Sequence, residues 1–256
     1  MSIIGQLKNG DILMINIVVP MAGRGQRFLD KGISTPKPLI EVNSNPFISH
    51  VIDSVSFDDA KFYFLIRAQH LKENNFNEIF KKKKIDYKII PVNEDTEGAA
   101  CTVLLGINEM NKDFPLIVKD CDQIMNWSKK NFLKFVNRKK ADGTLVTVPT
   151  TNPGFSYVEL FDDMSSVTRT KEKEVVSSFG NTGCYYFQNT NEYEYYTNLM
   201  IKKNIRVKNE FYVSQVYNEY ILDNKKINHY PIPEIFSINT PEELKKNKNL
   251  ISDFLS

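Results

Sequence analysis

The feature that most constrains the fold is an alternation, from Met14 onward, between short apolar, β-branched runs and longer segments with helical periodicity. This pattern is typical of a mostly parallel sheet flanked by helices. We therefore predict an α/β fold. In the first half, strands are expected at residues 15–19, 61–66, 87–92 and 116–119, and helices at residues 46–56, 69–83 and 98–110.

After about residue 140 the expected strands follow one another more quickly, and turn signals such as Asn152-Pro153-Gly154 separate them. A mixed sheet is predicted there. Its strands are expected at residues 144–148, 157–161, 183–187 and 226–231, and two helices at residues 191–203 and 213–223. A final helix should begin at Thr240, a good N-cap residue followed by proline.

Length and charge bound the organisation and the partners. A chain of 256 residues is long enough for one substantial α/β core. We expect an N-terminal extension at residues 1–13 and a single domain at residues 14–256. Lys and Arg total 33 against 31 Asp and Glu, so a net charge of +2 provides no basic field for nucleic acid.

Cysteine usage and hydropathy indicate a cytoplasmic protein. The three cysteines are widely spaced and form no CxxC pair, which predicts neither a disulfide framework nor a zinc site. The N-terminus lacks the features of a secretory signal, and no run of about 20 apolar residues is present to span a membrane. We therefore expect no membrane partner.

A glycine-rich loop directly after the first expected strand carries the strongest chemical signal. It contains Gly23, Gly25 and Arg27, and Lys37 follows within the segment TPKPL. Glycines at the carboxyl end of a strand let backbone N–H groups approach a triphosphate, and two cations balance its charge. A dinucleotide fingerprint would need glycine in place of Phe28, and the GK[ST] of a Walker loop is absent.

These residues resemble the sugar-phosphate nucleotidyltransferase family, whose members make nucleoside diphosphate sugars in a GT-A-like Rossmann-type fold. The segments VPMAGRG, PKPLIEV, EGAACTVLL, CDQI, GCYYF and NEFYVSQVYNE are similar to a branch associated with bacterial capsule and surface polysaccharide. The resemblance implies transfer of a nucleoside monophosphate from a nucleoside triphosphate to a small phosphorylated acceptor. It also implies a nucleotide-binding half at residues 14–140 and an acceptor-binding half at residues 141–256.

The resemblance assigns roles on the nucleotide side. Arg27 and Lys37 match the cations that hold the triphosphate and stabilise charge on the α-phosphoryl group. The remaining nucleotide-binding residues that it implies are Ala22, Gly23 and Gly25 in the loop, and Glu97, Gly98 and Ala99 in a turn that recognises the base.

Two aspartates follow the strand expected at residues 116–119, where open α/β sheets bind ligands. Asp122 matches the family's metal-binding aspartate, and Asp120 is a second candidate, or a residue that only caps or orients. Hard oxygen ligands beside phosphates suit Mg²⁺. Many relatives carry another aspartate where this chain has Ser237 and Asn239, so the sequence leaves the number of metal ions open.

On the acceptor side, Lys173 resembles a lysine that meets the acceptor phosphate, although a lysine in such a charged stretch is more often plain surface. The other acceptor-binding residues implied by the resemblance are Glu172, Gly183, Glu210, Tyr212 and Tyr217. For the two tyrosines, a place in the core is the alternative.

The substrates and two rival functions remain open at this stage. The resemblance favours CTP, with a sugar 1-phosphate, phosphocholine or phosphoglutamine as acceptor, in supply of a precursor for capsule or surface polysaccharide. A metal-dependent glycosyltransferase of similar fold and a non-catalytic nucleotide-binding protein are the alternatives, and release of pyrophosphate separates them from a nucleotidyltransferase. The sequence leaves a homo-oligomer open.

Overall fold

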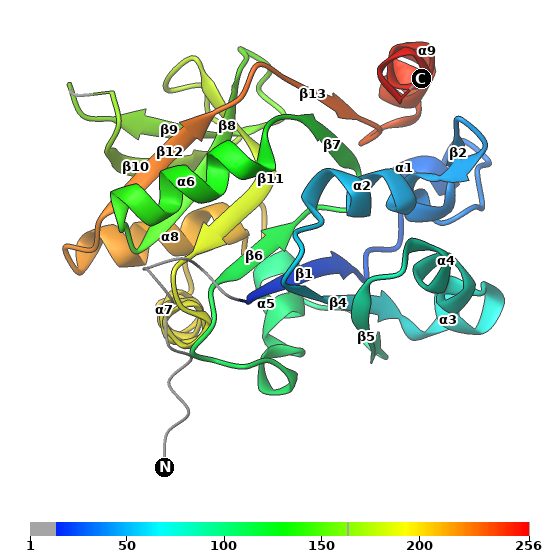
Figure 1. The fold of residues 1–256 in the computed structure, drawn as a ribbon, viewed down its shortest axis with the longest axis horizontal. Helices are drawn as coiled ribbons and strands as arrows, with labels where there is room; N and C mark the ends of the chain where they lie inside the picture. The colour runs from blue at the N-terminus through cyan, green and yellow to red at the C-terminus, as the bar shows by residue number, and fades with distance from the viewer. Residues whose placement is uncertain (1–13, 163, 256) are drawn as a thin grey trace.

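One sheet organises the molecule, which we describe from a computed structural model covering residues 14–162 and 164–255 (Figure 1). Within these residues nine strands form the sheet: β1 (Ile15–Met21), β4 (Ala60–Arg67), β5 (Asp86–Val92), β6 (Leu116–Lys119), β8 (Gly143–Pro149), β9 (Ser156–Leu160), β10 (Val167–Glu172), β11 (Phe179–Phe187) and β12 (Ile227–Pro231). Their order is β10-β9-β11-β6-β1-β4-β5, and β8 pairs with both β11 and β12.

The sheet changes character between the two halves of the chain. β1 pairs in parallel with β4 and β6, and β4 pairs in parallel with β5. β11 pairs antiparallel with β6, β8 and β9, and so joins the two halves. The predicted α/β fold, parallel in its first half and mixed in its second, is confirmed.

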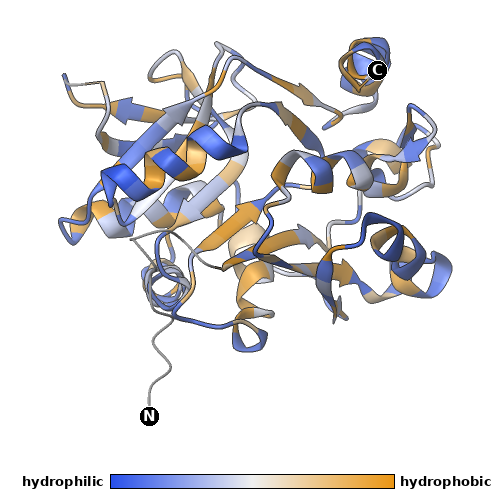
Figure 2. Cartoon of the chain, viewed as in Figure 1, coloured by the Kyte–Doolittle hydropathy of each residue, from blue (hydrophilic) through white to orange (hydrophobic). Residues whose placement is uncertain are grey.

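Helices cover both faces of the sheet because successive strand residues point to opposite sides. In β1, Ile17 belongs to one buried cluster and Val18 to the other. The first cluster contains residues of α2 (Phe47–Val55), α4 (Phe76–Lys83), α6 (Lys129–Lys139) and α9 (Pro241–Leu255). The second contains residues of α5 (Ala99–Leu104), α7 (Thr190–Lys202) and α8 (Val213–Leu222). Figure 2 shows the apolar strands between these two helical layers.

Two expected helices are shorter than the sequence pattern predicts. The segment 69–83 is divided into α3 (Ala68–Glu73) and α4, because Asn75 caps α4 by accepting a hydrogen bond from the backbone N–H of Glu78 at 3.3 Å. The helix expected at 98–110 ends at Leu104. Gly106, a poor helix former, precedes a single 3₁₀ turn at Ile107–Glu109.

Several short elements lie outside the expected set. α6 begins after Ser128, whose hydroxyl accepts a hydrogen bond from the N–H of Asn131, and β10 is a polar strand at the end of the sheet. A separate ribbon pairs β7 (Gln123–Asn126) with β13 (Glu234–Ser237). The remaining elements are α1 (Gln26–Leu29), η1 (Lys37–Leu39), β2 (Glu41–Val42) and β3 (Asn45–Pro46).

The C-terminal helix begins as predicted. The hydroxyl of Thr240 accepts a hydrogen bond from the N–H of Glu243 at 3.1 Å, which caps α9. In the part of the chain that the structure describes, no helix is long and apolar enough to cross a membrane. The expected extension at residues 1–13 lies outside the described residues.

Candidate active site

A first cavity of about 530 Å³ lies beyond the carboxyl ends of β1, β4, β5 and β6. Parallel strands bring residues that are distant in sequence to this edge of an open sheet. The cavity is lined by residues 20–25, Lys37, Pro38, Arg67, His70, Asp95, Thr96, Gly98, Ala99, Thr102, residues 120–122 and Glu210.

The glycine-rich loop forms one wall of the first cavity. Gly25 has φ +72°, a conformation that favours glycine, and it leads directly into the short helix α1. Ala22, Gly23 and Gly25, predicted to bind the nucleotide, all line the cavity with Lys37. Four of the predicted residues are thus gathered at one site.

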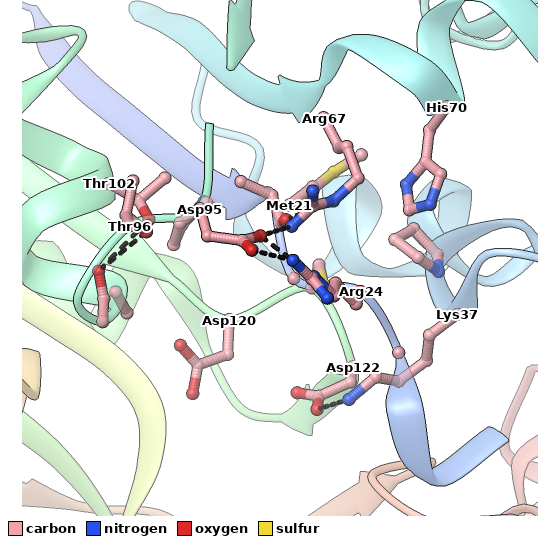
Figure 3. A pocket seen from close by; sticks show the side chains of 18 of the residues that line it. Met21, Arg24, Lys37, Arg67, His70, Asp95, Thr96, Thr102, Asp120 and Asp122 are labelled. Atoms are coloured by element: carbon pink, nitrogen blue, oxygen red, sulfur yellow. Dashed lines mark hydrogen bonds and ion pairs between the residues drawn. The ribbon is translucent and has the colours of Figure 1, made fainter. Parts of the chain in front are cut away.

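Lys37 and Asp122 form an ion pair inside the first cavity, with Nζ and Oδ2 2.7 Å apart (Figure 3). The two side chains are only 20% and 13% exposed. Burial disfavours both charges, but mutual attraction outweighs it, so the pKa of Lys37 is raised and the pKa of Asp122 is lowered. The pair therefore stays ionised.

Asp120 is half-buried beside this pair and packs against Gly183 of β11. Gly183 has φ +62°, and a Cβ atom there would overlap the carboxylate of Asp120. The backbone N–H of Asp120 donates to the carbonyl of Gly183 at 2.8 Å. Burial and then the negative charge of Asp122 raise the pKa of Asp120 to about 7. A cation beside the two carboxylates would therefore stabilise their charged forms.

Three charged residues that were not predicted from the sequence, Arg24, Arg67 and Asp95, form a network that lines the first cavity. Asp95 accepts hydrogen bonds from Arg24 of the glycine loop and from Arg67 at the end of β4 (Figure 3). These hydrogen bonds, and then the positive charges, lower the pKa of Asp95 to about 2. Their positions in the sequence could have indicated this network, because Arg67 ends a parallel strand and Asp95 closely follows another.

The turn predicted to recognise the base is joined to the half of the chain that is predicted to bind the acceptor. The carboxylate of Glu97 lies 2.9 Å from Arg206, and Glu97 does not line the first cavity, whereas Gly98 and Ala99 do. Phe211 N–H donates to the carbonyl of Glu97 at 2.7 Å. Gly98 has φ +125°, and a Cβ there would lie 2.5 Å from the carbonyl oxygen of Phe211.

A second cavity of about 530 Å³ adjoins the first. The predicted residues Glu172, Lys173, Gly183, Glu210 and Tyr212 all line it. The rest of its lining is Arg27, Asp120, Asp122, Gln123, Asn152, Gly154, Phe155, Ser156, Asn181, Tyr185, Ser237, Asn239, Thr240 and Glu243. Asp120, Asp122 and Glu210 line both cavities, so the two spaces meet at carboxylates.

Cations in the second cavity are held by polar neighbours. Lys173 donates to the Tyr212 hydroxyl at 2.6 Å, and its Nζ lies 4.4 Å from the centre of that ring. Burial opposes the charge, but the hydrogen bond to Tyr212 and the negative charges of Glu172 and Glu210 together outweigh it and raise the pKa of Lys173. Arg27, expected on the triphosphate, lines this cavity and donates to the Asn239 side chain at 3.1 Å.

Tyr217, predicted to bind the acceptor, lies elsewhere. Its side chain is fully buried, its ring stacks on Phe187 at 4.5 Å, and its hydroxyl donates to the carbonyl of Tyr186 at 2.9 Å. It lines neither cavity. Apolar neighbours on α8 and β11 place it in the core, which was the stated alternative.

Hard oxygen ligands for a divalent cation are present where the cavities meet. Within residues 14–162 and 164–255, no three His, Cys, Asp or Glu side chains gather as a complete metal site. The two carboxylates of Asp120 and Asp122 fit Mg²⁺, which typically takes one or two carboxylates with substrate oxygens and water. Glu243 is occupied nearby, because its carboxylate accepts from the Ser237 hydroxyl and the Asn239 N–H.

Comparisons with known proteins identify the family of this chain. A family model described as "Nucleotidyl transferase" matches residues 17–226. The bifunctional protein GlmU of Methanococcus maripaludis (strain S2) is 27% identical over 180 residues, which cover 69% of this chain and 41% of that protein. The chain spans less than half the length of the curated relatives it matches.

Two solved structures share the fold. A nucleoside-diphosphate-sugar pyrophosphorylase from Vibrio cholerae RC9 has a TM-score of 0.80 at 22% identity, covering 91% of this chain and 99% of the other. An inositol-1-phosphate CTP transferase from T. maritima has a TM-score of 0.71 at 11% identity, covering 94% of this chain and 96% of the other.

Proposed function

This chain belongs to the nucleotidyl transferase family. We propose that it transfers a nucleoside monophosphate from a nucleoside triphosphate to a small phosphorylated acceptor, releasing pyrophosphate. The observation that carries the proposal is the meeting of two cavities at Asp120, Asp122 and Glu210. A reaction between two bound substrates needs two adjoining spaces with the reacting atoms at their junction.

The first cavity is proposed to bind the triphosphate. The loop of Ala22, Gly23 and Gly25 offers backbone N–H groups to phosphate oxygens, and Lys37 supplies a half-buried positive charge. Gly98 and Ala99 line the same cavity from the start of α5, the segment proposed to contact the base.

The second cavity is proposed to bind the acceptor. Arg27 and Lys173 provide positive charge for its phosphate. Two buried oxygens in the lining, Oε1 of Gln123 and Oδ1 of Asn181, have no hydrogen-bond partner among the described residues.

Asp122, with Asp120, is proposed to hold Mg²⁺. This ion would neutralise charge on the phosphates while they react. Lys37 lies 2.7 Å from Asp122 and would fix the orientation of that carboxylate.

The proposed chemistry is a direct in-line displacement. An oxygen of the acceptor phosphate attacks the α-phosphorus, a new P–O bond forms, and the bond to the leaving pyrophosphate breaks. An ionised phosphate needs no strong general base, and phosphoryl-type transfer depends chiefly on positioning and charge stabilisation. Arg27, Lys37 and Lys173 are proposed to supply these effects.

For the triphosphate we propose CTP, and for the biological role the supply of an activated precursor for capsule or surface polysaccharide. The support is the resemblance of segments such as EGAACTVLL and NEFYVSQVYNE to the capsule-associated branch. A sugar 1-phosphate, phosphocholine and phosphoglutamine are the acceptors to compare.

The test is pyrophosphate release by the purified protein with Mg²⁺. CTP, UTP, GTP, ATP and dTTP are each combined with a panel of sugar 1-phosphates, phosphocholine and phosphoglutamine. The proposal expects acceptor-dependent release with one pair, loss of release with EDTA, and recovery with added Mg²⁺. Nucleotide binding without release for any pair would count against catalysis and favour a nucleotide-binding protein.

A further inference from the structure

Arg24 occupies an unusual position for an exposed arginine, because it lies between the two glycines of the loop in the first cavity. Its side chain is 64% exposed. Among the residues described, its hydrogen bonds go only to Asp95, from Nε at 3.1 Å and from an Nη nitrogen to the second carboxylate oxygen. One carboxylate therefore determines where the Arg24 guanidinium lies.

Arg67 binds the same carboxylate in a different way. Its side chain is only 16% exposed, its Nε donates to the carbonyl of Ala22 at 2.9 Å, and an Nη nitrogen donates to Asp95 at 2.6 Å. Arg67 is thus fixed by the fold, whereas Arg24 is fixed by Asp95 alone. Figure 3 shows Asp95 between the two guanidinium groups.

Arg24 can break its ion pair with Asp95 without making Asp95 an unpaired carboxylate. Two guanidinium groups and one carboxylate sum to one positive charge. If Arg24 turned away, Arg67 would still neutralise Asp95, so no unpaired negative charge would face an incoming anion. A single arginine on Asp95 would not permit this.

Arg24 also lies where the first cavity meets a further space of about 490 Å³, which Arg24 and Gly25 of the glycine loop help to line. The residues that line both spaces are Arg24, Gly25, Lys37, Arg67 and His70. Three of them carry positive charge, and none is a carboxylate. The junction therefore suits the anionic tail of a ligand whose other end occupies the first cavity.

We propose that Arg24 is a triphosphate-binding residue that Asp95 holds in place in the free protein, and that nucleotide binding exchanges its ion pair with Asp95 for one with the β- and γ-phosphates. This inference rests on the proposed function, because it takes the first cavity as the triphosphate site. It names a second cation for the triphosphate beside Lys37, because Arg27, the other cation that the family resemblance implies, lines the second cavity.

The exchange is favourable on general grounds. Exposed ion pairs such as that of Arg24 with Asp95 contribute little stability. Arginine binds phosphate oxygens through two parallel charge-assisted hydrogen bonds, and a triphosphate offers several negative charges at once. The nucleotide can therefore displace Asp95 from Arg24, while Arg67 retains it.

The experiment measures the dissociation constants of CTP and CMP by titration calorimetry with Mg²⁺ and without acceptor, after a check of all five triphosphates on the unmodified protein. The variants are Arg24→Gln, Asp95→Asn and their combination. Arg169→Gln is the matched control, because Arg169 is a similarly exposed arginine bonded to Glu159 through two nitrogens, and it lines neither cavity. Thermal unfolding of each variant checks the fold.

The proposal expects Arg24→Gln to raise the Kd for the triphosphate about 10-fold or more, as for loss of a charged hydrogen bond. The Kd for CMP should change less than about 2-fold. Asp95→Asn should lower the Kd for the triphosphate about 3-fold or more, because it frees Arg24. In the Arg24→Gln background the same change should have no effect. A gain that persists there would show simple charge repulsion by Asp95 and overturn the exchange.

Other outcomes separate this inference from the proposed function. If the unmodified protein binds a triphosphate and Arg24→Gln binds it equally well, the role of Arg24 is overturned and the proposed function stands. If the unmodified protein binds none of the five triphosphates, the proposed function fails and this inference fails with it.

Discussion

The two cavities are built in different ways, although they meet at the same carboxylates. The first is made from loops that follow four parallel strands, so neighbouring strand ends bring its residues together. The second collects residues from the glycine loop, the antiparallel strands and the start of α9. A parallel sheet places a site at a defined edge, whereas the mixed region depends on long connections that return to it.

The two cavities also differ in how their polar groups are paired. In the first cavity the charged groups already pair with one another, as Lys37 does with Asp122 and Arg24 with Asp95. In the second, the buried oxygens of Gln123 and Asn181 have no partner among the described residues. The cations of the first cavity are thus paired with carboxylates, whereas Arg27 and Lys173 of the second donate hydrogen bonds to the neutral side chains of Asn239 and Tyr212.

The largest effect is expected from Lys37→Ala, which removes a half-buried charge from the first cavity. Turnover should fall about 10²–10³-fold, the usual cost of losing one preorganised group that stabilises transition-state charge. Steady-state pyrophosphate release measures it. Lys31→Ala is the control, because Lys31 is 62% exposed and lines neither cavity. Equal rates for both variants would remove Lys37 from the reaction.

A smaller effect is expected from Lys173→Ala in the second cavity. Losing a charged hydrogen bond to the acceptor phosphate should raise the KM for the acceptor about 10–100-fold while the Kd for the triphosphate stays unchanged. Lys171→Ala is the control, since Lys171 pairs with Glu174 and does not line the cavity. A matching loss of triphosphate affinity would contradict the separation of the two cavities.

Gly98→Ala tests the connection between the halves. The added Cβ would meet the backbone of Phe211 at 2.5 Å and require a positive φ. Overpacking of this kind should reduce the free energy of unfolding by about 1–3 kcal/mol. Because Phe211 lies between Glu210 and Tyr212 of the second cavity, the acceptor KM should rise together with the triphosphate Kd. Denaturant unfolding and both binding measurements check this, and unchanged acceptor kinetics would argue against the connection.

The smallest effect is expected from Tyr217→Phe. Loss of one buried hydrogen bond should cost about 1 kcal/mol, or about 2–4 °C in Tm. Acceptor KM should not change, because Tyr217 lines neither cavity. Tyr212→Phe is the comparison, since it removes the hydroxyl that accepts from Lys173. A raised acceptor KM with normal stability in Tyr217→Phe would return this residue to the acceptor site.

The sequence predicts most of the parallel half because β1, β4 and β6 are largely buried on both faces and read as apolar runs, although the edge strand β5 is mostly half-buried or exposed. β1, β4, β5 and β6 all overlap the expected segments. β10, with the sequence VTRTKE, lies at the end of the sheet and has no such signal. In α6 only Phe132 and Val136 are buried, so its apolar face is too narrow to stand out among charged residues.

The sequence indicates the glycine loop and Asp122 because each follows a readable strand, and Lys37 because of the segment TPKPL that contains it. It does not predict the Arg24–Asp95–Arg67 network, since Asp95 lies 71 residues from Arg24 and 28 from Arg67. Local sequence also cannot tell a tyrosine that lines a cavity from one that packs inside. Tyr212 and Tyr217 lie five positions apart, but Tyr212 lines the second cavity and Tyr217 is buried in the core.

The position of β11 has a consequence for the growing chain. β1, β4, β5 and β6 are all complete once Lys119 has been added, but β11, which pairs with β6, ends only at Phe187. Until then β6 presents an open strand edge, which is a template for pairing with another chain. Synthesis slowed between these points, or a truncation at residue 140, should therefore favour aggregation, and co-expression with residues 141–256 should relieve it.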